Sequence, residues 1–123
     1  MAEQLYNVET PLTHSAFIVG SGPVETIPAT VKSGQNLAQY EVVAIETASG
    51  EIVTFDEGGA GGAEVARYIA VYAVDATGGA ATASFYKAGQ FNADLAVWSG
   101  TPTAAQKAVA FSDTPISLLT PNK

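Results

Sequence analysis

The stretch Phe85-Tyr86-Lys87-Ala88-Gly89-Gln90-Phe91, followed by Leu95-Ala96-Val97-Trp98, decides how this chain folds. Aromatic and apolar residues surround a single glycine, a pattern that predicts a strand, a turn at Gly89 and an aromatic return, with a closing strand further on at residues 116–119. The last third of the chain also holds the only Trp and three of the five Phe. We therefore expect its large apolar residues to form the structural core: Phe85, Phe91, Trp98, Val109, Phe111 and Ile116.

Strand-like patterns extend upstream and downstream of this stretch. Residues 40–47 alternate, residues 48–50 make a turn and residues 51–55 return, which predicts a hairpin. Residues 56–63 hold four glycines and predict a loop. Further strands are expected at 68–74, 82–87 and 116–119.

One helix is expected over residues 104–110, which have high helix propensity. Thr101 can act as its N-cap with Pro102 at the first helical position, and Thr103 with Gln106 has capping-box spacing one register later. Because this helix is short, it must dock its apolar side chains inward to persist. The predicted fold class is therefore mostly β with one or two short helices.

Residues 1–33 differ from the rest of the chain. Proline and glycine interrupt them, and neither a helical nor a strand period lasts more than a few residues. We predict an extended arm over 1–33 that can pair as a strand when it meets a free edge, and a β-rich domain over 34–123. The arm carries short apolar clusters and the only histidine of the chain: Leu5, Tyr6, Val8, His14, Phe17 and Ile18.

Composition limits the possible partners. The 123 residues include 12 acidic and 5 basic side chains, a net charge of −7, and the basic residues are scattered. Such a chain would be repelled by nucleic acid and by anionic lipid, so we expect neither partner. Much of the apolar content is alanine, which fills little volume, and this favours a protomer that completes its core against a neighbour.

Motifs for catalysis or for a cofactor are weak. Residues 58–62 are glycine-rich but lack the Lys-Ser/Thr of a phosphate loop. His14 has no second histidine and no cysteine to complete a metal site. Asp56, Glu57 and Glu64 lack calcium-loop spacing. We expect neither an enzyme nor a cofactor.

A family resemblance adds to this interpretation. The pattern F-Y-K-A-G-Q-F with Trp98 seven residues later, followed by A-F-x-x-T-x-I-S from Ala110, resembles the head decoration proteins of lambda-like bacteriophages. The sequence Ile69-Ala70-Val71 with Asp75 is similar to the central strand of that family, and His14-Ser15-Ala16 is similar to its H-T-A.

The resemblance implies a β-clip-like bent ribbon or incomplete barrel and a homotrimer. It implies a virion protein, made in the host cytoplasm, that binds the major capsid protein at threefold sites on the outer surface of the expanded head. There it would stabilise the shell against the pressure of packaged DNA, with an N-terminal arm that becomes ordered on the capsid protein. The resemblance implies neither an enzyme nor a cofactor.

Two alternatives belong to other classes. A carbohydrate-binding β domain would need exposed aromatic side chains near Asp56 and Glu57. An acid hydrolase would need paired carboxylates at a spacing that the sequence does not present.

Overall fold

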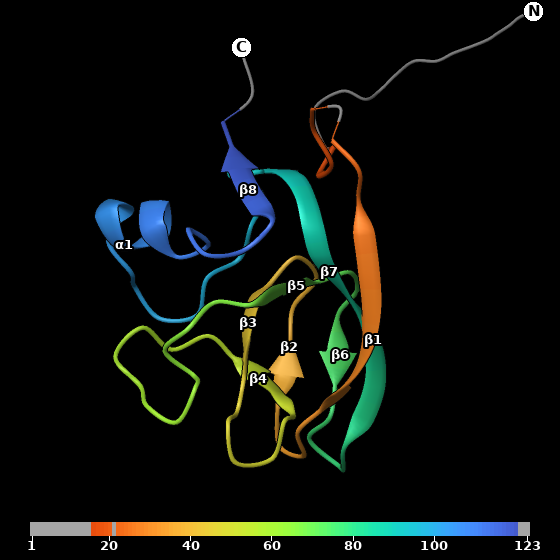
Figure 1. Ribbon diagram of the computed structural model, residues 1–123. Helices are drawn as coiled ribbons and strands as arrows, with labels where there is room; N and C mark the ends of the chain where they lie inside the picture. The colour runs from red at the N-terminus through yellow and green to blue at the C-terminus, as the bar shows by residue number, and fades with distance from the viewer. Residues whose placement is uncertain (1–15, 21, 121–123) are drawn as a thin grey trace, which may run out of the picture.

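The computed structural model describes residues 16–20 and 22–120, and these form a mostly β structure with one short helix (Figure 1). The elements in chain order are β1 (Glu25–Val31), β2 (Asn36–Leu37), β3 (Val42–Ile45), β4 (Ile52–Thr54), β5 (Tyr68–Ala70), β6 (Val74–Asp75), β7 (Ala81–Asn92), α1 (Ala104–Val109) and β8 (Ile116–Leu119).

The main sheet closes on itself. Its order is β1-β4-β3-β5-β7-β8, and an additional pairing of β1 with β7 joins the first five strands into a barrel. β8 extends the sheet beyond the closed part, and β2 pairs with β6 in a separate two-stranded sheet. The predicted fold class, mostly β with an incomplete barrel, is confirmed. The hairpin expected over 40–55 is present as antiparallel β3 and β4.

The central element is β7, which is long enough to serve two parts of the molecule (Figure 1). Its first part pairs antiparallel with β1, from Val31 opposite Ala81 to Glu25 opposite Ala88. Its last four residues pair in parallel with β8. The barrel and the helical end of the molecule therefore share one strand.

The turn predicted at Gly89 is wrong, because β7 runs through this residue without reversing. Gly89 has a φ of 142° and is buried. A Cβ atom built there would lie 2.8 Å from Cζ of Phe91 and 3.2 Å from Cγ2 of Val24. The glycine is present because the Phe91 ring lies against the backbone, where no side chain fits.

One other strand prediction needs correction. The run 68–74 is split: β5 ends at Ala70, and β6 resumes at Val74, where it pairs with β2 instead of continuing along β7. Tyr72, between them, is 66% exposed. The closing strand expected at 116–119 is present as β8.

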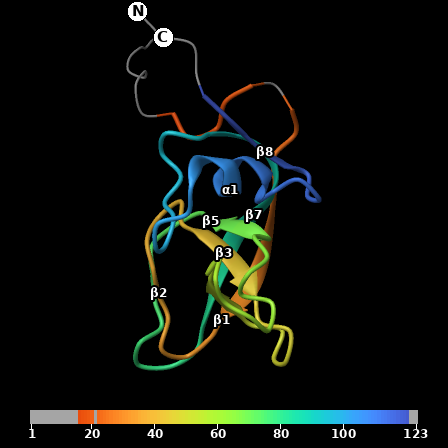
Figure 2. The same cartoon turned by 90° about the vertical axis from the view of Figure 1, so that its left-hand side faces the viewer.

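The helix α1, which lies beside β8 (Figure 2), begins after Thr103, so the later of the two capping registers is the one formed. The Thr103 side chain accepts a hydrogen bond from the Gln106 N–H at 3.1 Å, and the Thr103 N–H donates to the Gln106 side chain at 2.7 Å. The prediction of Val109 as a core residue is wrong for this chain, since Val109 is 63% exposed. Phe111, just beyond the helix, makes the buried contact instead.

The predicted arm boundary at residue 33 does not hold for residues 25–31, which form β1 inside the barrel. Val31 is fully buried there. Phe17, also predicted to lie in the arm, is 4% exposed and belongs to the core. These apolar residues are buried because Ile18 and the residues of β1 pair along one edge of β7.

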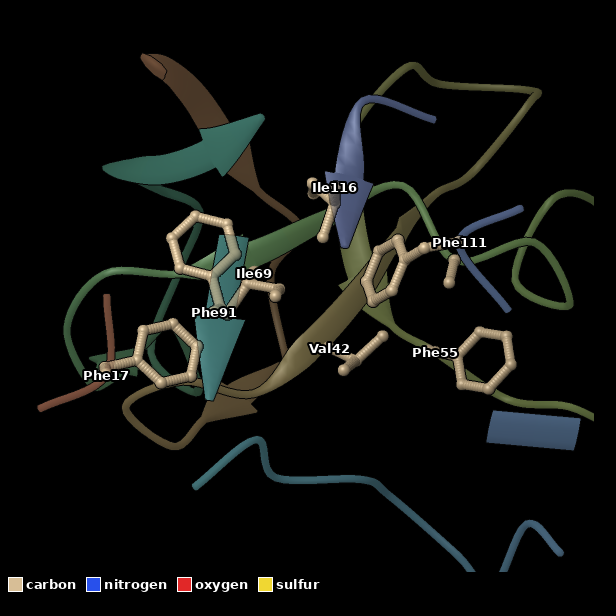
Figure 3. Close-up of a cluster of buried hydrophobic side chains, with 8 residues drawn as sticks. Phe17, Val42, Phe55, Ile69, Phe91, Phe111 and Ile116 are labelled. Carbon is tan, nitrogen blue, oxygen red and sulfur yellow. The ribbon is translucent and has the colours of Figure 1, made fainter. Parts of the chain in front are cut away.

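The core consists of two clusters. One fills the barrel around Val43, Ile52 and Phe85. The other lies at the end of the molecule that carries α1 and β8, and Figure 3 shows its aromatic rings grouped around Val42 and Ile69. The second cluster joins side chains from segments far apart in sequence: Phe17, Phe55, Phe91, Phe111 and Ile116.

Candidate interaction surfaces

The residues predicted for the arm fall into two groups. Leu5, Tyr6, Val8 and His14 lie outside the described residues. Phe17 is buried and Ile18 is 47% exposed, although they are neighbours in the chain. The structure therefore separates one core residue from one surface residue within what the sequence treats as a single apolar cluster.

Phe17 is held by other aromatic rings. Its ring stacks on Tyr40 with 3.9 Å between centroids and lies 5.0 Å from Phe91. The backbone on both sides of Phe17 is tied to β7, where the Asn92 N–H donates to the Phe17 carbonyl at 2.7 Å. The Asn92 side chain also donates to the Ala16 carbonyl at 3.2 Å. The chain is thus anchored to the sheet from Ala16 onward.

The predicted core residues occupy three environments, one of which is the exposed position of Val109. Four of them are buried, namely Phe85, Phe91, Phe111 and Ile116. Trp98 is half-buried and packs edge-on against Phe55, with 5.8 Å between ring centroids. The Nζ atom of Lys107 lies 5.9 Å from the Trp98 ring centroid, a distance that suits a cation–π contact. Trp98 therefore joins α1 to the core.

A groove of about 740 Å³ lies between α1 and β8. Trp98, Phe111 and Ile116 contribute apolar surface to it, and Lys107 lines its helical side. The sequence did not predict this groove. Its lining comes from residues 93–98, from α1 and from β8, and only the folded structure brings these segments together. Its lining combines this apolar surface with polar side chains such as Asp94 and Thr114, a mixture that suits contact with another polypeptide segment.

A second groove, of about 480 Å³, lies between α1 and the loop that follows β4. Val65 and Val109, which are 46% and 63% exposed, both line it. Glu57, Glu64 and Asp113 also lie along it, with Arg67 as the basic side chain. This surface carries mixed charge and contiguous apolar area.

The acidic residues of the glycine-rich loop stabilise its own turns. Asp56 accepts a hydrogen bond from the Gly58 N–H at 3.2 Å, and Glu64 accepts one from the Gly62 N–H at 3.0 Å. Within residues 16–20 and 22–120, no group of three or more histidine, cysteine or acidic side chains could hold a metal ion. Phe55, beside Asp56, is 3% exposed and cannot stack on a sugar.

Other titratable groups serve the fold. Glu41 is buried, and its carboxylate accepts hydrogen bonds from the Ala38 N–H and the Thr54 hydroxyl. The pKa of Glu46 is lowered by hydrogen bonds from Lys32, at 2.6 Å, and from Ser49. Burial raises the pKa of Tyr86.

In the described part of the chain, no helix has the length and apolar character needed to cross a membrane.

Comparison with known proteins identifies the family. A search of the curated proteins finds no match for the chain. A family model described as Bacteriophage lambda head decoration protein D matches residues 7–117, which is most of the sequence. The match spans the anchored segment at Phe17, all of β7 and the start of β8. The chain therefore belongs to the bacteriophage lambda head decoration protein D family, whose members decorate the phage capsid.

Proposed function

We propose that this protein binds as a trimer at threefold sites on the outer surface of the expanded phage head and stabilises the shell against the pressure of packaged DNA. The observation that carries this proposal is the family match over residues 7–117. The net charge of −7 supports a position on the outside of the shell, since a chain of this charge is repelled by DNA.

Attachment to the major capsid protein is assigned to residues 1–15. The chain is hydrogen-bonded to β7 through Ala16, Phe17 and Val19, so Ala16 is held at the edge of the sheet. Leu5, Tyr6 and Val8 are apolar residues that could alternate along an added strand. This shorter arm replaces the 1–33 arm, because β1 and Phe17 belong to the body.

The energetics favour three arms over one. Ordering a flexible backbone costs about 1–2 kcal/mol per residue, so a single arm should bind weakly. Three arms on one trimer raise the overall affinity, since the second and third contacts form at a high effective concentration. His14 lies near the start of the body, so a contact there would make attachment depend on pH near the ordinary pKa of histidine, about 6.5.

The experiment is a deletion of residues 1–15, with Phe17 retained so that the core stays intact. Light scattering should give a trimer for both the parent and the truncated protein. The parent should bind expanded, undecorated heads, and the truncated protein should not. Replacing Leu5, Tyr6 and Val8 together with serine is the matched variant of full length, and it should also fail to bind. If the truncated trimer decorates heads as tightly as the parent, the attachment surface lies in the body.

A further inference from the structure

Two free edges of the sheet lie on opposite sides of one residue. Phe91 of β7 pairs with Ile18 on one side and with Leu118 of β8 on the other. Adjacent strands are about 4.8 Å apart, so Ile18 and Leu118 are separated by about 10 Å, with β7 between them. Within residues 16–20 and 22–120, no further strand pairs with either edge.

The backbone of Leu118 points away from β7. The Gly89 N–H donates to the Pro115 carbonyl at 3.1 Å, and the Ala93 N–H donates to the Leu119 carbonyl at 2.8 Å. Because the direction of the backbone groups alternates along a strand, the N–H and C=O groups of Leu118 face outward. β8 therefore presents a donor and an acceptor at the edge of the α1–β8 groove.

The backbone of Ile18 also points away from β7. The Val19 N–H donates to the Gln90 carbonyl at 2.9 Å, and the Asn92 N–H donates to the Phe17 carbonyl at 2.7 Å. The residue between them, Ile18, must direct its own N–H and C=O outward. The two edges thus present complementary pairs of backbone groups.

The side chains beside these edges are complementary in character. Ile18 is 47% exposed, and Val24, which follows it after a short loop, is 37% exposed. On the other edge, Leu119 is 39% exposed, and the 740 Å³ groove beside β8 has Trp98 and Phe111 in its lining. A strand edge carrying exposed aliphatic residues would bury them in this groove, and each Å² of apolar surface removed from water favours association.

We propose that the β8 edge of one copy pairs with the Phe17–Val19 edge of the next copy, so that Ile18 lies opposite Leu118 across the subunit boundary. This inference rests on the proposed trimer. A threefold ring needs two different surfaces on each copy, because an interface that uses the same patch twice gives a twofold dimer. Phe17–Val19 runs antiparallel to β7 and β8 runs parallel to it. If the threefold axis runs along the strands, rotation keeps the strand directions, so β8 of one copy and Phe17–Val19 of the next are antiparallel. In the closed ring, each of these two edges is then paired with a neighbouring copy.

Cysteine cross-linking tests the pairing directly, since the chain has no cysteine of its own. The variant I18C/L118C cannot close a disulfide within one chain, because the two Cα atoms are separated by more than the roughly 7 Å that a disulfide spans. Oxidation should link three copies into a covalent trimer that does not grow further. The variant I18C/V109C is the matched control: Val109 is 63% exposed and should give no covalent trimer.

A second variant tests the backbone pairing. Leu118→Pro removes the outward N–H while keeping the N–H groups that pair with β7, and, like Leu118→Val, it also shortens a side chain that packs against the core. It should shift sedimentation from trimer to monomer at concentrations where the parent is a trimer, whereas Leu118→Val, which keeps the N–H, should remain a trimer.

The outcomes separate this inference from the proposed function. A trimer that forms without the 18–118 cross-link, and that Leu118→Pro leaves intact, would overturn the interface while leaving the trimer in place. If that trimer also loses head binding on Leu118→Pro, the β8 edge belongs to the capsid contact. A parent protein that sediments as a monomer would overturn both the trimer and the interface.

Discussion

The ring of Phe17 lies flat on the ring of Tyr40, with 3.9 Å between their centroids and 8° between their planes. Tyr40 itself has a φ of 65°, which is unusual for a residue with a side chain. The stack therefore joins the first described segment of the chain to the tight connection between β2 and β3, and it makes the N-terminal segment part of the folded body.

Replacing Phe17 with alanine should destabilise the body strongly. The ring is 4% exposed and touches Tyr40, Tyr86 and Phe91, so its removal leaves a cavity. We expect a loss of about 3–5 kcal/mol in the free energy of unfolding. Urea denaturation followed by Trp98 fluorescence measures it. Ile18→Ala, at the exposed neighbouring position, should cost much less in the isolated monomer.

Trp98→Ala should cost less than the loss of a fully buried ring. Trp98 is half-buried and contacts Phe55, Phe111 and the Lys107 ammonium group. We expect about 2–3 kcal/mol, and a smaller loss for Trp98→Phe, which keeps part of the packing. Circular dichroism melts report the change. Val109→Ala is the surface control and should stay within about 0.5 kcal/mol of the parent; a larger loss would show that Val109 is covered in the assembled protein.

Gly89→Ala should be strongly unfavourable although it adds one methyl group. The φ of 142° disfavours any side chain, and the new Cβ would lie 2.8 Å from the Phe91 ring. Strain of this kind costs on the order of 1–3 kcal/mol, and the contact adds to it. Gly78→Ala is a suitable control, because a Cβ there meets nothing within 4 Å. Equal melting temperatures for the two variants would contradict the role assigned to Gly89.

The Lys32–Glu46 ion pair should make stability depend on acid pH. Lys32 lowers the pKa of Glu46 in the folded protein below its ordinary value of 4.5. A carboxylate with a lowered pKa stabilises the fold above 4.5, and this contribution disappears as the pH falls through the lowered pKa.

The measurement is a series of thermal melts between neutral and strongly acid pH. Glu46→Gln should melt below the parent at pH 7, and the difference should vanish at the acid end. Lys32→Met, which removes the other partner, should lose the larger part of this pH dependence, since the hydrogen bond from Ser49 to Glu46 remains. A gap between parent and Glu46→Gln that stays constant across the series would exclude this contribution.

Local sequence patterns determined several elements correctly. The hairpin of β3 and β4 follows from alternation around the turn at Ser49 and Gly50, and α1 follows from the Thr103 capping box. Both depend on residues only a few positions apart, so the responsible interactions are visible in the sequence itself. The family was also recognisable from the sequence, since the pattern from Phe85 to Trp98 lies within the region that the family model matches.

Tertiary structure decided the rest. Phe17 and Ile18 look equivalent in the sequence, yet one is buried and the other exposed, because β7 pairs with their segment and directs alternate side chains to opposite faces. The sequence around Gly89 predicts a turn, but the glycine is needed because the Phe91 ring lies against its backbone. Barrel closure by β1 and β7, and the placement of Ile18 and β8 on either side of Phe91, depend on pairing between distant segments. A local pattern carries no information about such pairing, because the partner strand and its register are chosen by the packing of the whole core.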